Sequence, residues 1–158
     1  MPRTIHQAMQ DIDLILHFVR ELAIYEKAEH EVKATPDHVR RTLFCANPAV
    51  FGLICEIEGK AVGFAVYFFN YSTWLGQHGL YLEDLFVRPD FRRRGLARKL
   101  LSTLAQECVE RGYTRLQWAV LNWNVNAIAL YDEVGGKPQT EWTTYRVSGP
   151  ELTALAEG

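Results

Sequence analysis

The 158-residue sequence has few cysteines and no long apolar run. Its three cysteines, Cys45, Cys55 and Cys108, form no C-x-x-C pair, so the sequence offers neither a disulfide framework nor a zinc-ligand spacing. No segment approaches the ~20 apolar residues that cross a bilayer, and the N-terminus lacks the apolar stretch of a signal peptide. These absences predict a cytoplasmic protein without a membrane partner.

The common nucleotide-binding fingerprints are also missing. The sequence contains neither G-x-G-x-x-G nor G-x-x-x-x-G-K-[ST], which argues against a Rossmann or P-loop enzyme. Its five histidines show no i, i+4 pair, so we expect no metal site. A formal net charge of -2 excludes a generally basic surface, and we expect no nucleic-acid partner.

What the sequence does contain is the composition of an ordinary globular domain. Hydrophobic residues make up 48%, aromatic residues 12% and charged residues 23% of the chain. A chain of this length and composition can bury a core of its own without disulfides or metal. We expect residues 1–158 to form a single domain.

Hydrophobic periodicity and turn signals predict the element order βααβββαβαβ, followed by a helical tail. The expected strands lie at residues 3–6, in two runs separated by a hairpin turn at 58–60, and at 80–87, 116–121 and 142–147. The expected helices lie near residues 14–25, 36–44, 96–111 and 125–134. This mixture predicts a mixed α/β or α+β domain built on one six-stranded sheet.

The positive charge of the chain is concentrated in one short window. Residues 88–99 carry a net charge of +5, whereas the rest of the chain carries -7. The window joins an apolar strand to a helix start, where unpaired N–H groups and the helix dipole attract anions. Backbone amides from Arg93 to Arg98 are suited to hold a phosphate, and Gly95 lets it approach closely because it has no Cβ. The alternative is a merely solvated helix start, but arginines are disfavoured there unless an anion binds.

Three segments around this window carry a family pattern: Arg88-Pro89-Asp90, Arg92-x-x-Gly95-x-Ala97 and Asn124-x-Asn126-Ala127-x-x-Leu130-Tyr131-x-x-x-Gly135. Together they resemble the acetyl-CoA site of the GNAT superfamily of N-acetyltransferases, and the resemblance spans nearly the whole chain. Four further segments look like its diamine (polyamine) acetyltransferase branch: Glu21-Leu22-Ala23-x-Tyr25-Glu26, Gly63-Phe64-Ala65-x-Tyr67, Tyr81-Leu82-Glu83-Asp84-x-Phe86-Val87 and Trp123-Asn124. The sequence departs from the family pattern in having alanine at 97 and arginine at 93.

The resemblance implies a fold and a set of cofactor contacts. The implied fold is a mixed, mostly antiparallel sheet of six to seven strands, flanked by helices and splayed between the fourth and fifth strands. The strand segment 85–87 is expected to pair with the pantetheine arm of acetyl-CoA. The residues that the resemblance assigns to the cofactor are Leu85, Phe86, Val87, Arg92, Arg93, Arg94, Gly95, Leu96, Ala97, Arg98, Asn124, Asn126, Ala127 and Tyr131.

The resemblance also implies the catalytic groups. Tyr131 is expected to donate a proton to the departing thiolate, since a phenol is protonated at neutral pH. Glu83 is expected to take the proton of the acceptor amine, directly or through water, with Asp84 as a second acidic contact beside a strand bulge. The residues expected to contact the acceptor are Tyr25, Glu26, Glu83, Asp84 and Trp142. Cys108 lies in the apolar stripe of a helix, which favours direct transfer in a ternary complex over an acetyl-cysteine intermediate.

Several alternatives stay open on the sequence. Tyr131 has an alternative interpretation as a purely structural core aromatic. Glu83 and Asp84 have an alternative interpretation as solvent-facing residues at a strand end. The acceptor has three candidate forms, a small amine, a protein N-terminus or a protein lysine. Acidic residues at 26, 29, 31, 83 and 84 favour a small cation such as a polyamine, a diamine or a lysine-like amino acid. A non-catalytic acyl-CoA-binding module is an alternative to an enzyme. Separately, the resemblance implies that the protein is a homodimer.

Overall fold

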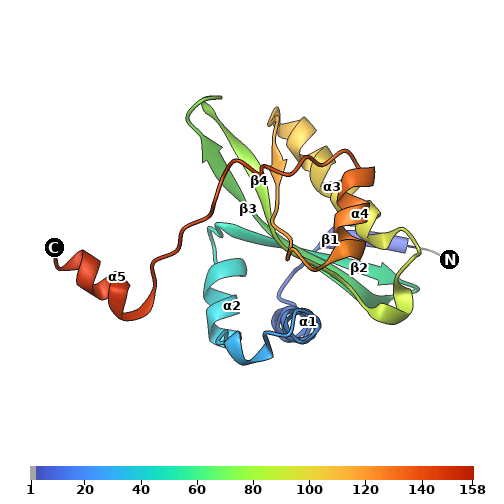
Figure 1. Cartoon of the computed structure of the whole chain (residues 1–158). Coiled ribbons are helices and arrows are strands. Elements are labelled where there is room, and N and C mark those ends of the chain that lie inside the picture. Colours follow the sequence, from blue (N-terminus) through green and yellow to red (C-terminus); the bar gives the residue numbers. More distant parts are fainter. Residues whose placement is uncertain (1–2) are drawn as a thin grey trace. The chain divides into compact units, whose positions relative to one another are not determined.

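The computed structural model describes residues 3–158, which form two compact units divided after Asn124 (Figure 1). The first unit contains the strands β1 (Arg3–Gln7), β2 (Val50–Ile57), β3 (Lys60–Ser72), β4 (Gln77–Val87) and β5 (Leu116–Gln117). Its helices are α1 (Ile12–Tyr25), η1 (Glu29–Glu31), α2 (Pro36–Leu43), η2 (Pro89–Phe91) and α3 (Leu96–Arg111). The second unit contains α4 (Val125–Glu133) and α5 (Gly149–Ala156).

The sheet of the first unit is mixed and mostly antiparallel, as predicted. Its strands follow the order β1-β2-β3-β4-β5, and only β4 and β5 run parallel. These two strands pair through just Leu80–Leu116 and Tyr81–Gln117, so within the described residues β4 has no strand partner on that side from Leu82 onward. The predicted splay between the fourth and fifth strands is therefore confirmed.

The predicted strand count was wrong. The described residues form five strands, where the sequence predicted six and the resemblance six to seven. The strand predicted at 116–121 ends at Gln117, and residues 142–148 form no strand at all. Strand-like composition is not sufficient, because a strand also needs a neighbouring backbone to pair its N–H and C=O groups.

The elements bury side chains on both faces of the sheet. Figure 1 shows α1 and α2 on one side of the sheet and α3 on the other. On the first side, Phe18 stacks on Phe64 with ring centroids 5.2 Å apart. On the second side, α3 contributes a buried stripe of Leu96, Leu100, Leu101, Leu104 and Cys108. Among the described residues, no helix is both long and apolar enough to span a membrane.

Several local predictions were confirmed. Thr35 caps α2 by accepting a hydrogen bond from the His38 N–H at 3.2 Å, which places Pro36 at the first helical position. The β2–β3 hairpin turns at Glu58 and Gly59, whose φ values of 51° and 77° are typical of a tight two-residue turn. Gly112 ends α3 in the left-handed conformation, and the Tyr113 N–H donates back to the Cys108 carbonyl.

Candidate active site

The predicted anion-binding loop connects β4 to the N-terminus of α3. Gly95 precedes α3 with a φ of 73°, a left-handed conformation that glycine adopts without steric cost. A Cβ built on Gly95 meets nothing within 4 Å, so the space in front of the helix start is open to a ligand. Leu96 is buried and anchors the first turn of the helix. The helix start therefore presents its first N–H groups, those of Leu96 and Ala97 among them, beside open space.

The arginines of this loop fall into two kinds. Arg92 is half-buried, and its Nε donates to the Val87 carbonyl at 2.9 Å. Arg93 and Arg94 are exposed, so their charges are available to an anion in solvent. Arg93 has a φ of 60°, which is strained for a non-glycine residue.

The predicted pantetheine-binding segment is the end of β4. Phe86 and Val87 are buried, and the Phe86 ring lies 6.3 Å from the Phe18 ring of α1. One backbone edge of this segment pairs with β3, from Ala65–Leu85 to Gly63–Val87. The other edge lies beyond the end of the β4–β5 pairing. A splayed strand of this kind can accept an extended ligand as an additional strand.

A bulge in β4 separates the two acidic residues of the strand. Val66 pairs with Asp84 and Tyr67 pairs with Leu82, which leaves Glu83 as the extra residue. The bulge changes the alternation of the strand, because an inserted residue moves every later side chain to the opposite face. Asp84 consequently lies on the same face as Phe86, toward α1, whereas Glu83 is exposed. The predicted bulge is thus present at the expected place.

The acidic residues of the predicted acceptor pocket influence one another. The pKa of Asp84 is raised to about 6, first because burial removes water from the carboxylate and then because Glu83 and Glu26 add negative charge. Burial also raises the pKa of Glu26, which follows the last residue of α1. The fold therefore brings Glu26, Glu83 and Asp84 from two separate segments into one negatively charged cluster.

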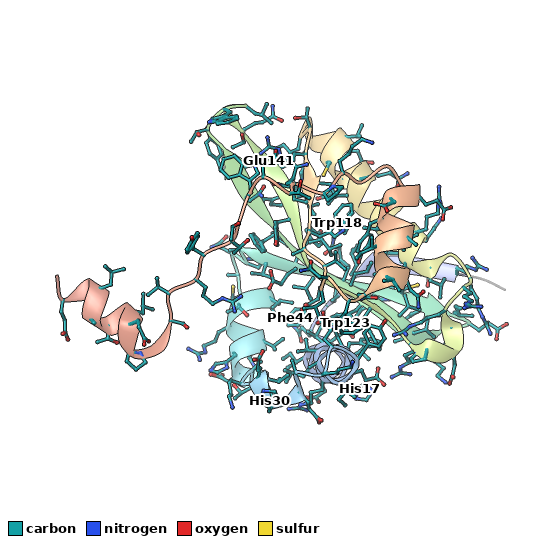
Figure 2. The ribbon with its side chains drawn as sticks, in the orientation of Figure 1. His17, His30, Phe44, Trp118, Trp123 and Glu141 are labelled. Atoms are coloured by element: carbon teal, nitrogen blue, oxygen red, sulfur yellow. The ribbon has the colours of Figure 1, made fainter. Side chains whose placement is uncertain are left out.

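Tyr25 lies between the anion-binding loop and the segment after β5. Its hydroxyl donates to Asn124 Oδ1 at 3.3 Å, and its ring lies 5.9 Å from that of Trp123. Figure 2 labels Trp123, which lies close to α1. The Lys27 ammonium stands 4.8 Å above the Trp123 ring. This cluster shows that an aromatic surface on this side of the first unit can hold a primary ammonium group.

The remaining predicted site residues belong to the second unit. Asn126, Ala127 and Tyr131 lie on α4, and Ala127 and Tyr131 are one turn apart on the same face of that helix. Tyr131 is half-buried, Asn126 is exposed, and the Gly136 N–H donates to the Tyr131 carbonyl where the helix ends. Trp142 lies in the segment between α4 and α5, and 69% of its surface is exposed.

The cysteines do not resemble activated nucleophiles. Cys55 and Cys108 are buried, and burial raises the pKa of both thiols. A raised pKa leaves less thiolate at neutral pH, which is the opposite of what a nucleophilic cysteine needs. Cys45 is exposed and lies after the end of α2.

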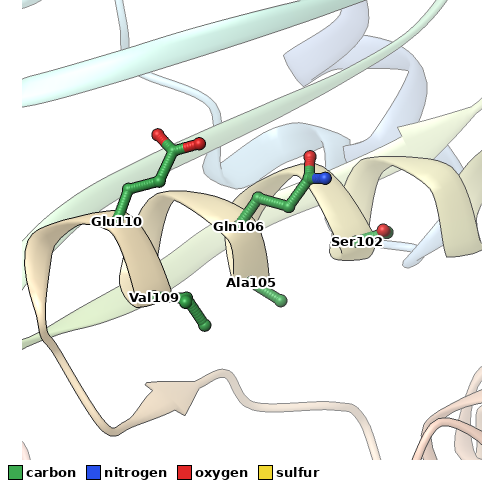
Figure 3. Close-up of a pocket in the computed structure, with 5 residues that line it drawn as sticks. All are labelled: Ser102, Ala105, Gln106, Val109 and Glu110. Atoms are coloured by element: carbon green, nitrogen blue, oxygen red, sulfur yellow. The ribbon is translucent and has the colours of Figure 1, made fainter.

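A shallow hollow of about 300 Å³ lies on the exposed side of α3. It is lined by Ser102, Ala105, Gln106, Val109 and Glu110, all from this one helix (Figure 3). A surface supplied by a single helix cannot surround a ligand, and none of its residues was predicted to act. The hollow is therefore not the candidate active site.

The sequence pattern did not identify two contacts of the site. Arg3 in β1 donates from Nη1 to the Arg94 carbonyl at 2.7 Å and so holds the loop from a strand that is distant in sequence. Trp123 was part of a matched segment but was not predicted as a contact residue. A tryptophan directly before Asn124 was a usable signal, whereas nothing in the sequence marks Arg3.

Comparisons with known proteins identify the family and the fold. The model of the acetyltransferase (GNAT) family matches residues 17–135. The thialysine N-epsilon-acetyltransferase of Caenorhabditis elegans is 41% identical over 146 residues, which cover 90% of this chain and 89% of that protein. The Sus scrofa enzyme of the same name is 36% identical over 157 residues, covering 92% of both chains. An integron cassette protein from the mobile metagenome of V. cholerae has the same fold, with a TM-score of 0.82, 24% identity and coverage of 100% of this chain and 99% of that chain.

The class of protein follows from the family match and the relatives together. The chain belongs to the acetyltransferase (GNAT) family, and it is an N-acetyltransferase. Members of this family use acetyl-CoA as cosubstrate. The resemblance drawn from the sequence is therefore confirmed at the level of the family.

Proposed function

We propose that this enzyme transfers the acetyl group of acetyl-CoA to a primary amine on a small cationic acceptor. The observation that carries the proposal is the cluster of Glu26, Glu83 and Asp84 next to the splayed end of β4. Three carboxylates beside the expected thioester suit an acceptor that arrives positively charged. The rings of Tyr25 and Trp123 lie against Arg92 and Lys27, so this side of the unit already stabilises cations.

The similar enzymes narrow the class of acceptor. Two relatives are thialysine N-epsilon-acetyltransferases, and an Arabidopsis thaliana relative is an L-ornithine N5-acetyltransferase. Both names describe acetylation of a side-chain amine of a basic amino acid. We therefore place lysine-like amino acids ahead of diamines and polyamines as acceptors of this chain.

The proposed cofactor contacts follow the two ends of one extended ligand. The loop residues Arg93 to Arg98 hold the diphosphate through backbone N–H groups, with the exposed Arg93 and Arg94 adding charge. Leu85, Phe86 and Val87 pair with the pantetheine arm through their backbone. Asn124, Asn126 and Ala127 complete the cofactor contacts, as the family pattern implies. No step in this proposal needs a metal ion.

The proposed reaction is a direct transfer in a ternary complex. Glu83, exposed at the bulge, accepts the proton of the acceptor ammonium, directly or through water. The neutral amine then attacks the thioester carbonyl, a C–N bond forms and the C–S bond breaks. Tyr131 gives its phenolic proton to the departing thiolate, and the second proton that the nitrogen loses as the amide forms restores the phenol. As the family pattern implies, Trp142 contacts the acceptor. Asp84 and Glu26 hold the cationic chain of the acceptor in place.

A panel of amines tests the proposal. The release of free coenzyme A thiol is measured with thialysine, lysine, ornithine, putrescine, spermidine and a peptide with a free N-terminus, each with acetyl-CoA. We expect turnover with at least one small cationic amine and none with the peptide. Turnover with the peptide alone would contradict a small-amine acceptor and indicate protein acetylation instead. Binding of acetyl-CoA without turnover of any amine would favour a non-catalytic acyl-CoA-binding module.

We also propose a homodimer that works in the cytoplasm. Large apolar side chains such as Trp74 and Tyr145 are exposed by 86% and 92%, and a subunit interface would cover such residues. The three cysteines are all free thiols in the structure, which suits a reducing compartment.

A further inference from the structure

Arg92 differs from its neighbours because its guanidinium is engaged on three sides. Nε donates to the Val87 carbonyl at 2.9 Å, at the end of β4. The guanidinium carbon lies 4.6 Å from the centre of the Tyr25 ring and 5.5 Å from that of Phe86. The side chain is half-buried, whereas Arg93 and Arg94 are exposed. Arg92 therefore points back into the first unit.

These contacts hold the anion-binding loop and the end of β4 in place relative to each other, and the proposed cofactor contacts both. The hydrogen bond ties the start of the anion-binding loop to the end of the pantetheine-binding strand. Because one acetyl-CoA molecule spans both, a small shift between loop and strand would weaken either the diphosphate contacts or the strand-like pairing. A planar guanidinium that is both stacked and hydrogen-bonded restricts such a shift better than a flexible ammonium does.

The same contacts reach the proposed acceptor side. Tyr25 offers its ring to Arg92 and its hydroxyl to Asn124 Oδ1 at 3.3 Å, and it also packs near Trp123. A continuous chain of contacts thus runs from the loop through Arg92 and Tyr25 to the residues beside the acidic cluster. Tyr25 is the last residue of α1, so it comes from a segment that lies about 70 residues before Arg92 in the sequence.

We propose that Arg92 is a positioning residue, which couples the cofactor loop to the acceptor pocket by stacking on Tyr25. The proposal rests on the proposed function, since it presumes acetyl-CoA in the loop and an amine beside Tyr25. It assigns the phosphate-facing charge to Arg93 and Arg94 and gives Arg92 a different task. It follows that a residue of the acceptor pocket, Tyr25, contributes to the affinity for acetyl-CoA.

The test is a double-mutant cycle on acetyl-CoA affinity, measured by calorimetry. Arg92→Lys keeps the positive charge but removes the planar stacked group, and Tyr25→Leu keeps an apolar side chain but removes the aromatic face. Each single variant is expected to raise the dissociation constant for acetyl-CoA about 3- to 10-fold, the range of a part-exposed cation–π contact. The double variant is expected to lose no more acetyl-CoA affinity than the single variant with the larger loss, because both substitutions remove the same interaction.

Two further variants separate positioning from a general structural effect. Tyr25→Phe retains the aromatic face and loses the hydroxyl, so it is expected to recover most of the acetyl-CoA affinity that Tyr25→Leu loses. Arg111→Lys is the matched control, because Arg111 stacks 4.5 Å from the Phe69 ring at the other end of α3. It is expected to leave the acetyl-CoA affinity unchanged.

The results that overturn the inference differ from those that overturn the proposed function. A wild-type affinity in Arg92→Lys, an affinity in Tyr25→Phe as low as in Tyr25→Leu, or losses that multiply in the double variant would each refute the coupling. In all three cases the unaltered enzyme still acetylates an amine. If the unaltered enzyme binds acetyl-CoA but acetylates none of the amines in the panel, the proposed function fails instead, and the cycle on affinity remains readable.

Discussion

At the scale of single residues, the carboxyl group of Asp84 is partly shielded from water and lies near two other carboxylates. Its pKa is raised to about 6 by burial and by the charges of Glu83 and Glu26. The folded state therefore holds this proton more tightly than the unfolded state, where an aspartate has a pKa of about 3.9. The stability that follows is complete below about pH 4 and is lost as the pH rises through about 6. At neutral pH the charged Asp84 lowers the stability of the fold.

Asp84→Asn tests this cost. The variant is expected to melt a few degrees above the unaltered protein at pH 7.5, because it removes a half-buried charge. The difference is expected to shrink as the pH falls from about 6 to about 4, where Asp84 is neutral in the folded state. Melting temperatures at several pH values measure it, with the exposed Glu110→Gln as a control. A difference that does not change with pH would contradict the raised pKa.

Tyr131 is the proposed general acid that protonates the leaving thiolate. Tyr131→Phe keeps the ring on the half-buried side of α4 and removes only the hydroxyl. We expect kcat to fall by about 10²- to 10⁴-fold, the usual contribution of a general acid, while acetyl-CoA affinity changes little. Steady-state kinetics and calorimetry give the two values. Full activity in this variant would remove Tyr131 from the mechanism.

At the scale of elements, the start of α3 combines a left-handed glycine with open space. Gly95 and Gly112 flank the same helix with φ values of 73° and 74°, and a Cβ at either position meets nothing within 4 Å. A substitution by alanine is therefore equally strained at both positions, by about 1 kcal/mol. The two glycines differ in one respect, because only Gly95 stands where the diphosphate is proposed to approach.

Gly95→Ala and Gly112→Ala form a matched pair on this basis. Both are expected to lower the melting temperature by a similar few degrees. Only Gly95→Ala is expected to weaken acetyl-CoA binding, by at least 10-fold, because its methyl group meets the ligand. Thermal melts and calorimetry on both variants make the comparison. An equal loss of affinity in the two variants would show that helix strain, and not contact with the ligand, explains the effect.

The elements also show what a sequence pattern can predict. The caps at Thr35 and Gly112, the hairpin turn at 58–59 and the extent of α3 were foreseen because their signals lie within a few residues of each other. The predicted strand at 142–147 was wrong because a strand needs a neighbouring strand to pair with, and the residue pattern of a segment does not reveal whether one is present. The bulge at Glu83 was expected from the family resemblance, since composition alone gives no sign of it.

At the scale of the whole molecule, the site depends on contacts between distant segments. The burial of Asp84, the stacking of Arg92 on Tyr25 and the hydrogen bond from Arg3 join residues that no local pattern links. The sequence predicted candidate residues for the chemistry, and the roles of those residues stay predictions. It could not predict that one loop arginine faces inward while its neighbours face solvent, because that depends on which rings the folded chain places beside it.

The proposed homodimer is also a property of the whole molecule. Exposed apolar residues in both units, among them Trp74 and Tyr145, predict association in solution. Sedimentation velocity at micromolar protein concentration is expected to give twice the chain mass of 18.1 kDa. A single species of the chain mass across the concentration range would contradict the dimer.

The central claim is that the loop before α3 holds the diphosphate of acetyl-CoA, and amide chemical shifts in ¹⁵N-labelled protein test it most directly. Acetyl-CoA is expected to move the amide resonances of residues 93–97 strongly, together with those of Leu85 to Val87. Acetyl-pantetheine, which lacks the diphosphate, is expected to move the β4 resonances and leave those of the loop nearly in place. If acetyl-CoA leaves the loop amides unmoved and shifts the resonances of Ser102 to Glu110 instead, the claim is wrong.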